Sequence, residues 1–429
     1  MSITYLKKAL KTPETDETAT RETVLAILRD IKENGEEAAR KYAKQYDHWE
    51  GDFIVTAEEI STATSVLSKE AKEDIHFAYE QVYGFAVKQR QSLAEFKTEL
   101  YPGVTVGQKI VPVAVAGCYV PGGRYAHVAS AIMSIATAKA AGVPFVVSCS
   151  PSHHGKGIHP STLYAMSLCR SDVILTLGGV QGIASLAYGL FTGRQADVLV
   201  GPGNKYVAEA KRILFGEVGI DMFAGPSEIL IIADETADPK IVAIDLLAQA
   251  EHGYDSPTLL VTTSETLAQQ VLEQMPLLIE QLQDPEVSRC SWRDYGSVVW
   301  VTEREEAVRI SNEVASEHVE IQAADPDWWM GKLTNYGSLF LGEETTVAFG
   351  DKASGPNHIL PTKKAARYTG GLSVGKFLKT LTYQRLNREA SCKIGSVSAR
   401  ISRLEGMEAH ALSCEARLDK YCRGELIGR

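Results

Sequence analysis

The spacing of apolar residues changes along the chain, which indicates a helical opening followed by alternating strands and helices. Between about residues 20 and 100, apolar positions recur every three or four residues, as in ETVLAILRDIKENGEEAARKYAKQY, and this spacing is typical of amphipathic helices. From about residue 110, short apolar runs end in glycine and alternate with Ala-rich helical segments; these runs are VPVAVAGCYV, PFVVSCS, DVILTLGG and DVLVGPGN. Continuous apolar strands that alternate with helices predict a parallel sheet covered on both faces.

A second set of strands and helices follows from about residue 228. Its strand-like runs are EILIIADET, TLLVTTS and SVVWVT, and its helical segments include KIVAIDLLAQAEH and ETLAQQVLEQMPLLIEQL. We therefore expect two α/β units in succession. The chain has no repeat of short period and no low-complexity linker, so the limits of these units rest on changes of pattern alone.

The composition is that of an ordinary globular protein. The 429 residues are 45% hydrophobic and 23% charged, enough for a large core and roughly two to four domains of usual size. The net charge of -10 would repel nucleic acids and anionic membrane surfaces, so neither is an expected partner. The N-terminus lacks the apolar core of a signal peptide, and no segment approaches the roughly 18 apolar residues of a membrane span. We expect a cytoplasmic location.

The cysteines suggest neither a disulfide framework nor a zinc finger. They are odd in number and form no CxxC pair; the seven are Cys118, Cys149, Cys169, Cys290, Cys392, Cys414 and Cys422. The sequence therefore predicts reduced thiols that mostly pack in the interior.

Glycine-rich loops follow three of the strands in the first α/β unit. These loops are GCYVPGGR, LGGVQG and VGPGNK, and their polar or aromatic members are Tyr119, Gln181 and Asn204. Ligands of open α/β sheets collect at the carboxyl ends of strands, where glycine lets the backbone approach them, so three such loops favour a nucleotide-sized site. None of them is a GxGxxG or Walker loop, and the structural alternative is that the glycines only make tight strand-to-helix turns.

Candidate metal ligands begin at the end of the apolar run IVAIDLLAQA. Gln249 and His252 are three residues apart on a predicted helix, so both project from one face and could chelate a metal, or His252 could cap the end of the helix. Further candidates stand in polar clusters downstream: Glu317 and His318 in ASEHVEIQ, Asp351 and His358 in GDKASGPNHILPT, and Glu405 and His410 in LEGMEAHALSCE. From the spacing alone, metal binding and structural roles both remain open.

Several of these segments together resemble the histidinol dehydrogenase family, from about residue 20 to the C-terminus and in the order of the family's motifs. They are DVLVGPGNKYVAEAKRILFGEVGIDMFAGPSEILIIADETADPKIVAIDLLAQAEHG, CYVPGGR, GGVQGIASLAYG, SEHVEI, GDKASGPNHILPT and EGMEAH. The resemblance implies two incomplete Rossmann-like parallel-sheet domains with helical N-terminal and C-terminal extensions, in a domain-swapped homodimer.

The resemblance also implies how the chain is divided. Expected are an N-terminal helical arm at 1–20, a first α/β domain at 21–118 plus 228–370 with the zinc and acid/base residues, a second Rossmann-like domain on the NAD side at 119–227, and a C-terminal helical segment at 371–429 that completes the partner's site.

The family's site residues have matching positions here. The implied ligands of one Zn²⁺ per subunit are Gln249, His252, Asp351 and His410, and the implied acid/base pair is Glu317 and His318. The positions implied to contact NAD⁺ are Tyr119, Gln181 and Asn204. Ser227, His358 and Glu405 match positions around the substrate, together with the four ligands and His318. Glu405 and His410 would serve the active site of the partner subunit.

The implied activity is oxidation of a small primary alcohol through an aldehyde to a carboxylate with two NAD⁺. His318 would accept the hydroxyl proton, Glu317 would activate water, and zinc would chiefly orient the substrate. Two rivals are a cysteine-dependent aldehyde dehydrogenase that uses Cys118 and a metal- or ligand-binding homologue without catalysis. Cys118 lies on an apolar strand, where a small buried side chain is the commoner role.

Two segments bear on the substrate. GGRYAHVASAIMS and ARYTGGLSVGKFLKTLTYQ look less like histidinol dehydrogenases than like a paralogous branch that includes sulfopropanediol dehydrogenases. A sulfonate needs cationic or donor groups, for which Arg124, His127 and Arg367 are candidates, although the arginines could equally be solvated or bind nucleotide phosphates. The expected substrate is thus a sulfonated diol, 2,3-dihydroxypropane-1-sulfonate, with L-histidinol as the alternative.

Overall fold

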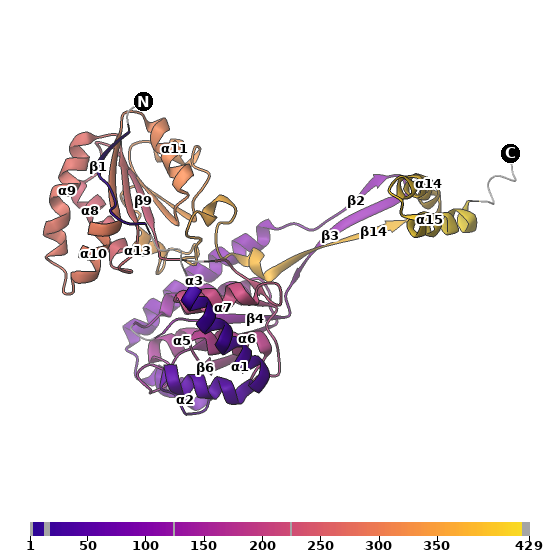
Figure 1. Ribbon diagram of the computed structural model, residues 1–429, viewed down its shortest axis with the longest axis horizontal. Helices are drawn as coiled ribbons and strands as arrows, with labels where there is room; N and C mark the ends of the chain where they lie inside the picture. Colours follow the sequence, from indigo (N-terminus) through magenta and orange to yellow (C-terminus); the bar gives the residue numbers. More distant parts are fainter. Residues whose placement is uncertain (1–2, 13–17, 123–124, 224, 423–429) are drawn as a thin grey trace. The chain divides into compact units, whose positions relative to one another are not determined.

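The computed structural model describes residues 3–12, 18–122, 125–223 and 225–422, which divide into two compact units (Figure 1). Unit 1 comprises residues 1–90 and 113–377, and unit 2 comprises residues 91–112 and 378–429. The joining of 91–112 to the C-terminal segment is absent from the predicted domain division, because a sequence pattern does not show which distant strands pair. No helix within these described ranges is long and apolar enough to cross a membrane.

One half of unit 1 is built on a six-stranded sheet, called sheet A. In spatial order its described strands are β1 (Ile3–Lys7), β11 (Gly296–Val301), β10 (Thr258–Thr262), β9 (Ile229–Ala233), β12 (His318–Gln322) and β13 (Ser338–Leu341). β1 is antiparallel to β11, and the other pairs are parallel. Residues 3–7 thus form an edge strand where a helical arm is predicted. So short a segment takes its conformation from the sheet edge that satisfies its backbone groups.

Helices cover both faces of sheet A, as the continuous apolar strands predict (Figure 1). Ile229, Ile231 and Ala233 of β9 belong to a core shared with α8 (Pro239–Ala250), α9 (Glu265–Ile279) and α10 (Glu286–Tyr295). Leu230 and Ile232 point to the other face, into a core shared with α11 (Arg304–Val314) and α12 (Pro326–Met330). This alternation follows from the two-residue period of a strand.

The other half of unit 1 is built on a parallel sheet, called sheet B. In spatial order its described strands are β6 (Val173–Thr176), β5 (Phe145–Ser150), β4 (Val115–Tyr119), β7 (Val198–Val200) and β8 (Gly219–Ile220). Its helices are α4 (Val128–Ala140), α5 (Pro160–Leu168), α6 (Gly179–Tyr188) and α7 (Lys205–Leu214). The predicted strands and the α/β class with parallel sheets are confirmed.

The N-terminal helices pack differently from the predicted division, which groups 21–118 with the residues of sheet A. α1 (Thr18–Tyr42) contacts α6 and α7, and its residues Val24, Ile27 and Leu28 share a core with strands of sheet B. α2 (Ala57–Ser65) contacts α5 of the same half, and the helix that follows is α3 (Lys69–Ser92). The apolar stripe of a helix shows that a face is buried but does not show against which sheet.

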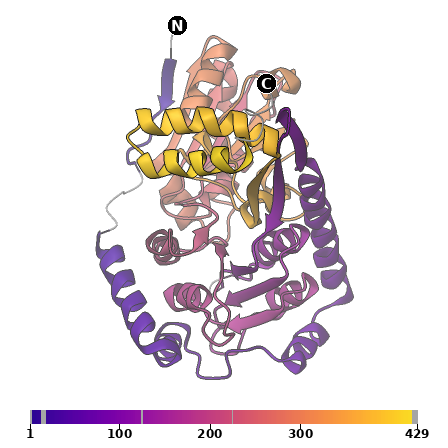
Figure 2. The same ribbon diagram turned by 90° about the vertical axis from the view of Figure 1, so that its right-hand side faces the viewer.

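Unit 2 combines an antiparallel ribbon with a helical hairpin. Its described strands are β14 (Leu378–Leu386), β3 (Val104–Pro112) and β2 (Phe96–Tyr101), in that spatial order. The chain then forms α14 (Arg388–Leu404) and α15 (Glu408–Tyr421), which pack side by side (Figure 2). Asn387 begins α14 as an N-cap, because its Oδ1 accepts a hydrogen bond of 2.8 Å from the Ala390 amide.

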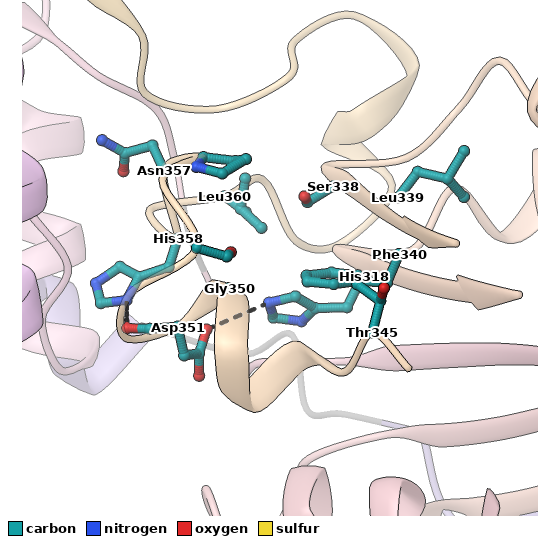
Figure 3. Close-up of a pocket in the computed structure, with 12 residues that line it drawn as sticks. His318, Ser338, Leu339, Phe340, Thr345, Gly350, Asp351, Asn357, His358 and Leu360 are labelled. Carbon is teal, nitrogen blue, oxygen red and sulfur yellow. Dashed lines mark hydrogen bonds and ion pairs between the residues drawn. The ribbon is translucent and has the colours of Figure 1, made fainter. Parts of the chain in front are cut away.

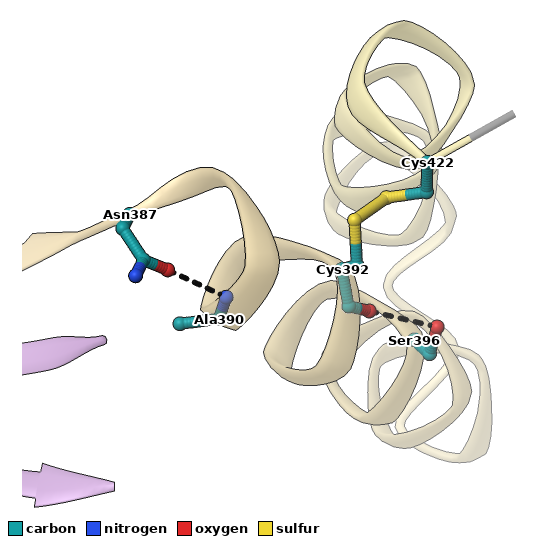
Figure 4. Close-up of a disulfide and its surroundings, with 5 residues drawn as sticks. All are labelled: Asn387, Ala390, Cys392, Ser396 and Cys422. Atoms are coloured by element: carbon teal, nitrogen blue, oxygen red, sulfur yellow. Dashed lines mark hydrogen bonds between the residues drawn. A yellow bond between two sulfur atoms is a disulfide. The ribbon is translucent and has the colours of Figure 1, made fainter. Parts of the chain in front are cut away.

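A disulfide joins the two ends of this hairpin and corrects the prediction of reduced thiols throughout. Cys392 in the first turn of α14 is bonded to Cys422 just after α15 (Figure 4). The bonded residues are 30 positions apart, so only the antiparallel packing of the helices brings them together. The remaining five cysteines are free, as predicted, and three of them are buried.

Thiol labelling tests this disulfide. Alkylation of the denatured, non-reduced protein is expected to label five cysteines, and prior reduction should raise the number to all seven. Replacing Cys392 and Cys422 with serine should lower the free energy of unfolding of the hairpin by about 3–4 kcal/mol, because the unfolded loop gains chain entropy. Cys414→Ser, a free cysteine on α15, is the matched control. Labelling of seven cysteines without reduction would contradict the bond.

Candidate active site

The acid/base pair lies at the amino edge of sheet A. His318 is the first residue of β12, and strand register places it beside Ile229 at the start of β9 and Ser338 at the start of β13. A cavity of about 230 Å³ opens here, lined by His318, Ser338, Asp351 and His358 among others (Figure 3). His318 and Asp351, for which the family resemblance implies catalytic and metal-binding roles, therefore lie at the edge opposite to the carboxyl ends of these strands.

His318 is held as a neutral imidazole with one nitrogen free. Its Nδ1 lies 3.0 Å from the Glu228 carbonyl oxygen, which can only accept, so Nδ1 carries the proton. Its Nε2 has no hydrogen-bond partner among the described residues and lies 3.9 Å from Asp351 Oδ1. The side chain is 3% exposed, and this burial lowers the pKa of His318 to about 4. Nε2 is thus an available base at neutral pH.

Glu317 is buried behind His318. Its Oε2 accepts a hydrogen bond of 3.0 Å from the Glu228 amide, and its carboxyl group also bonds the Ser227 side chain. Burial is the main cause that raises the pKa of Glu317 well above its usual value, and the carboxyl groups of Glu228 and Asp351 raise it further. This environment favours the neutral acid, which can donate a proton.

Three of the implied zinc ligands converge near His318. Asp351 follows α13 (Val347–Gly350), and its Oδ2 lies 4.0 Å from Nε2 of His252, which lies in the turn after α8. Gln249 is 2% exposed, and both polar atoms of its amide lack a hydrogen-bond partner among the described residues. Zinc bonds of about 2.0–2.2 Å to nitrogen and oxygen suit donors at this separation. The buried amide of Gln249, which has no hydrogen-bond partner among the described residues, has an oxygen of the kind that can bind zinc.

The fourth implied ligand lies in unit 2. His410 is exposed in the first turn of α15, and Glu405 is exposed at the end of α14. Within the part of the chain that the structure describes, no three His, Cys, Asp or Glu side chains are grouped closely enough to hold a metal.

His358 links the site to α4. Its Nδ1 donates to the Asp351 carbonyl oxygen at 2.8 Å, so its Nε2 can accept from the Ser130 hydroxyl at 3.2 Å. His127 is the N-cap residue of α4. Burial lowers the pKa of His127, and neighbouring His358, Lys352 and His252 lower it further, so this face of the site gathers cationic and donor groups.

The glycine-rich loops lie where an open sheet offers a ligand crevice. In sheet B the chain proceeds from β4 to β5 and β6 on one side and to β7 and β8 on the other, so the strand order reverses between β4 and β7. The loops that contain VPGGR and GPGN follow these two strands. A Cβ atom on Gly201 would lie 1.9 Å from the Tyr119 carbonyl oxygen, so the two strand ends approach too closely for any other residue.

The residues implied to contact NAD⁺ have structural partners of their own. The Tyr119 hydroxyl accepts from the Gly179 amide at 3.1 Å. The Gln181 amide is 1% exposed and donates to Asp47 at 3.0 Å. Asn204 is the N-cap of α7, and its Oδ1 accepts from two backbone amides. These hydrogen bonds hold the loops in place, as a nucleotide-binding crevice requires. The same bonds are also expected if the loops only make tight strand-to-helix turns.

Arg367 and Cys118 do not line the cavity described above. Arg367 is exposed on the short helix η2 (Ala365–Arg367), and Arg124 lies outside the described residues. Cys118 is fully buried on β4, and burial raises the pKa of its thiol far above neutral pH. A nucleophilic thiolate is therefore not favoured at Cys118.

Three acidic residues around the site were not predicted: Glu228, which is partly buried, and Asp245 and Glu320, which are buried. Burial raises the pKa of Glu228 to about 7, and Asp245 and Glu320 lie beneath the ligand-bearing elements. A weak signal exists for the last two, because each is a lone acid within an otherwise apolar segment, IVAIDLLA and HVEI. Glu228 precedes a strand and carries no comparable signal.

Comparison with known proteins defines the family. A family model described as histidinol dehydrogenase matches residues 10–418. A histidinol dehydrogenase homolog of Pelagibacter ubique is 54% identical, covering 98% of this chain and 99% of that protein. A sulfopropanediol 3-dehydrogenase of Ruegeria pomeroyi is 52% identical, covering 98% and 97%. The crystal structure of histidinol dehydrogenase from Elizabethkingia anophelis matches with a TM-score of 0.91 and 33% identity, covering 96% and 95%.

The chain belongs to the histidinol dehydrogenase family and is an oxidoreductase of that family. The resemblance on which the site residues were assigned is thus confirmed, and the family's members are NAD-dependent dehydrogenases that act on an alcohol or aldehyde.

The unpaired amide of Gln249 yields a test. Gln249→Met should raise the free energy of unfolding of the metal-free protein by about 1–2 kcal/mol, because it removes an unsatisfied buried polar group. The same change should weaken zinc binding at least about tenfold. The measurements are urea unfolding in the presence of EDTA and zinc competition against a chelator dye.

Gln181→Met is the matched control. This glutamine is also buried but donates to Asp47, so its replacement should lower stability. A loss of stability in Gln249→Met, or unchanged zinc affinity, would contradict the role of Gln249 as a ligand.

Proposed function

We propose that the protein is a zinc-dependent NAD⁺ oxidoreductase that oxidises a small primary alcohol through an aldehyde to a carboxylate. The proposal is supported by the approach of Asp351 to both His252 and the free Nε2 of His318, and by the unpaired buried amide of Gln249, three residues before His252. A hydride leaves a primary alcohol only as the hydroxyl proton departs, so a base must stand next to a group that holds the oxygen. This cavity combines both.

Zinc is the metal that suits these donors. Gln249, His252 and Asp351 would hold it together with His410 of the partner subunit in a domain-swapped homodimer. Bound there, zinc supplies a positive charge that orients the substrate hydroxyl and lowers the pKa of that hydroxyl. The mixed nitrogen and oxygen donors leave room for a substrate ligand, as catalytic zinc sites require.

His318 is the proposed base in each oxidation. Nε2 accepts the hydroxyl proton while the hydride leaves the carbon, and the hydrogen bond from Nδ1 to the Glu228 carbonyl stabilises the imidazolium that forms. In the proposed hydration of the aldehyde, Nε2 of His318 accepts a proton from water while the neutral carboxyl group of Glu317 donates its proton to the aldehyde oxygen. Glu317 lies 3.5 Å from Nδ1 and is shielded from solvent, so a proton then returns from the imidazolium to Glu317 and restores both groups. The hydrate then loses its second hydride by the same route.

The crevice between β4 and β7 is the proposed site of NAD⁺. Tyr119, Gln181 and Asn204 fix its walls, and the amides of the glycine loops can approach the pyrophosphate. When bound, NAD⁺ accepts the hydride at its nicotinamide ring. α4 begins just beyond the loop after β4 and carries Ser130, which contacts His358 of the substrate site.

The favoured substrate is 2,3-dihydroxypropane-1-sulfonate. The support is the Ruegeria pomeroyi relative named for sulfopropanediol, together with the donor groups of His127 and Lys352 near His358. L-histidinol is the second candidate, because the structural relative from Elizabethkingia anophelis is named for it and the ligand set is shared. A charge-assisted hydrogen bond to the sulfonate would favour binding of 2,3-dihydroxypropane-1-sulfonate over L-histidinol.

Side-by-side assays of NADH formation test the proposal. The zinc-loaded protein should form two NADH per molecule of 2,3-dihydroxypropane-1-sulfonate. Its kcat/KM for this substrate should be at least about tenfold above that for L-histidinol, because one charge-assisted hydrogen bond contributes a difference of about this size. Zinc removal should abolish turnover, and zinc should restore it. Turnover of histidinol alone would overturn the substrate. Full activity without zinc would overturn the metal role, and no turnover of either would favour a homologue without catalysis.

Substitution of the acid/base pair separates the two oxidations. His318→Asn should lower kcat for alcohol and aldehyde alike by about 10²–10⁴, the usual contribution of a general base. Glu317→Gln should slow aldehyde oxidation more than alcohol oxidation, so that aldehyde accumulates. Glu306→Gln on α11, where the glutamate pairs with Arg309, is the control for loss of a buried acid. Equal slowing of both steps in Glu317→Gln would reject the role of Glu317 in hydration.

A further inference from the structure

Two carboxyl groups are buried beneath the active site without lining its cavity. Glu320 on β12 is fully buried, and Asp245 on α8 is 9% exposed. Among the described residues, no lysine, arginine or histidine forms an ion pair with either of them. Buried acids are costly, so an arrangement that retains two of them calls for a structural or functional reason.

Each carboxyl group is bonded to neighbours from other elements. The Gln322 amide donates to Asp245 at 2.8 Å and to Glu320 at 3.3 Å. The Thr346 hydroxyl donates to Asp245 Oδ1 at 3.0 Å, and the Val347 amide donates to Glu320 Oε1 at 2.7 Å. The two carboxyl groups are also close enough to interact electrostatically, and the charge of Asp245 adds to the rise in the pKa of Glu320.

These bonds tie together the three elements that carry the site. Asp245 lies one helical turn before Gln249 on α8, so both project from one face of the helix. Glu320 lies two residues after His318 on β12 and points to the same side of the strand. Thr346 and Val347 begin α13, which Asp351 follows.

The beginning of α13 depends on Glu320. Thr346 is the N-cap residue, yet its side chain does not cap the helix, because its hydroxyl is turned to Asp245. Glu320 instead accepts the first amide of the helix, from Val347, and the Val347 carbonyl in turn accepts from the Asp351 amide at 2.8 Å. Two hydrogen bonds in series thus connect Glu320 to the backbone of Asp351.

The electrostatic state of the pair agrees with this role. Burial is the main cause that raises the pKa of Glu320 to about 8 and raises that of Asp245. The raised pKa of Glu320 favours its protonated form near neutral pH, and the Thr346, Val347 and Gln322 donors bond the oxygens of the two carboxyl groups. Such a pair is bonded on every side and rigid, which is what a support for metal ligands needs.

We propose that Asp245 and Glu320 are positioning residues that hold Gln249 and Asp351 at the separation that zinc binding requires. The inference rests on the proposed function, because it concerns the same metal site. Neither residue touches the metal or the substrate; both act through α8 and α13. Outer groups that orient metal ligands commonly contribute a factor of about 10–100 to metal affinity.

Zinc affinity of the full-length protein tests the inference. Glu320→Ala and Thr346→Val should each weaken zinc binding, by about 10–100-fold and by a few-fold respectively, measured by competition with a chelator dye. Glu320→Gln should stay within about threefold of the wild type, because its carbonyl can accept from Val347 while its amide donates to Asp245. Thr346→Ser keeps the hydroxyl and should likewise retain affinity. Glu306→Ala, which removes an acid from α11 in the same half of unit 1, is the control.

Thermal unfolding with and without zinc separates positioning from general stability. Variants that lose stability in EDTA but keep the wild-type increase in Tm on zinc addition would show a merely structural role and overturn the inference. Equal zinc affinity in Thr346→Val and the wild type would also overturn it, and this conservative variant remains informative if Glu320→Ala does not fold. A wild-type protein that binds no zinc would instead overturn the proposed function.

Discussion

The placement of Asp351 is the constraint on which the active site depends. Its two carboxylate oxygens face different histidines, with Oδ2 at 4.0 Å from His252 and Oδ1 at 3.9 Å from His318. Its backbone carbonyl accepts a hydrogen bond from His358, and its amide donates to the carbonyl of Val347, the first residue of α13, whose own amide donates to Glu320. Asp351 thus contacts or faces the three histidines that are proposed as metal ligand, base and substrate-site residue. A shift of Asp351 would disturb all of them together.

The two sheets of unit 1 contribute opposite edges. Sheet B offers the carboxyl ends of β4 and β7, where the strand order reverses and glycine loops leave room for a nucleotide. Sheet A offers the amino ends of β9, β12 and β13, where His318 stands beside Ser338. The hydrogen bond between Ser130 on α4 and His358 connects these two regions. In the proposed function, the edge of sheet B binds NAD⁺ and the edge of sheet A binds the alcohol. Hydride transfer requires these two edges to hold the two reactants next to each other.

Burial decides the chemistry of the groups in the cavity. The same lack of solvent keeps His318 neutral, favours the protonated form of Glu317 and keeps the Cys118 thiol from ionising. A neutral imidazole with its Nδ1 proton bound by a carbonyl suits proton removal from an alcohol, whereas an un-ionised thiol on β4 does not suit attack on an aldehyde. The physical environment, not the residue type, thereby favours proton removal by His318 over nucleophilic attack by Cys118.

The sequence by itself determined the class of fold, its strands and the family. Apolar runs closed by glycine have one stable solution, a parallel sheet between helices, and motifs in a fixed order identify relatives without coordinates. Local spacing predicted Gln249 and His252 on one helix, whereas α8 ends at Ala250 and His252 lies in the turn that follows. Only the tertiary structure decided that β1 forms a sheet edge, that α1 packs on sheet B, and that Cys392 meets Cys422. It also revealed that Asp245 in the middle of α8 and Glu320 in β12, 75 positions apart in the sequence, accept hydrogen bonds from the same Gln322 amide. The reason is that periodicity encodes which face is buried, whereas the identity of the partner depends on contacts between distant segments.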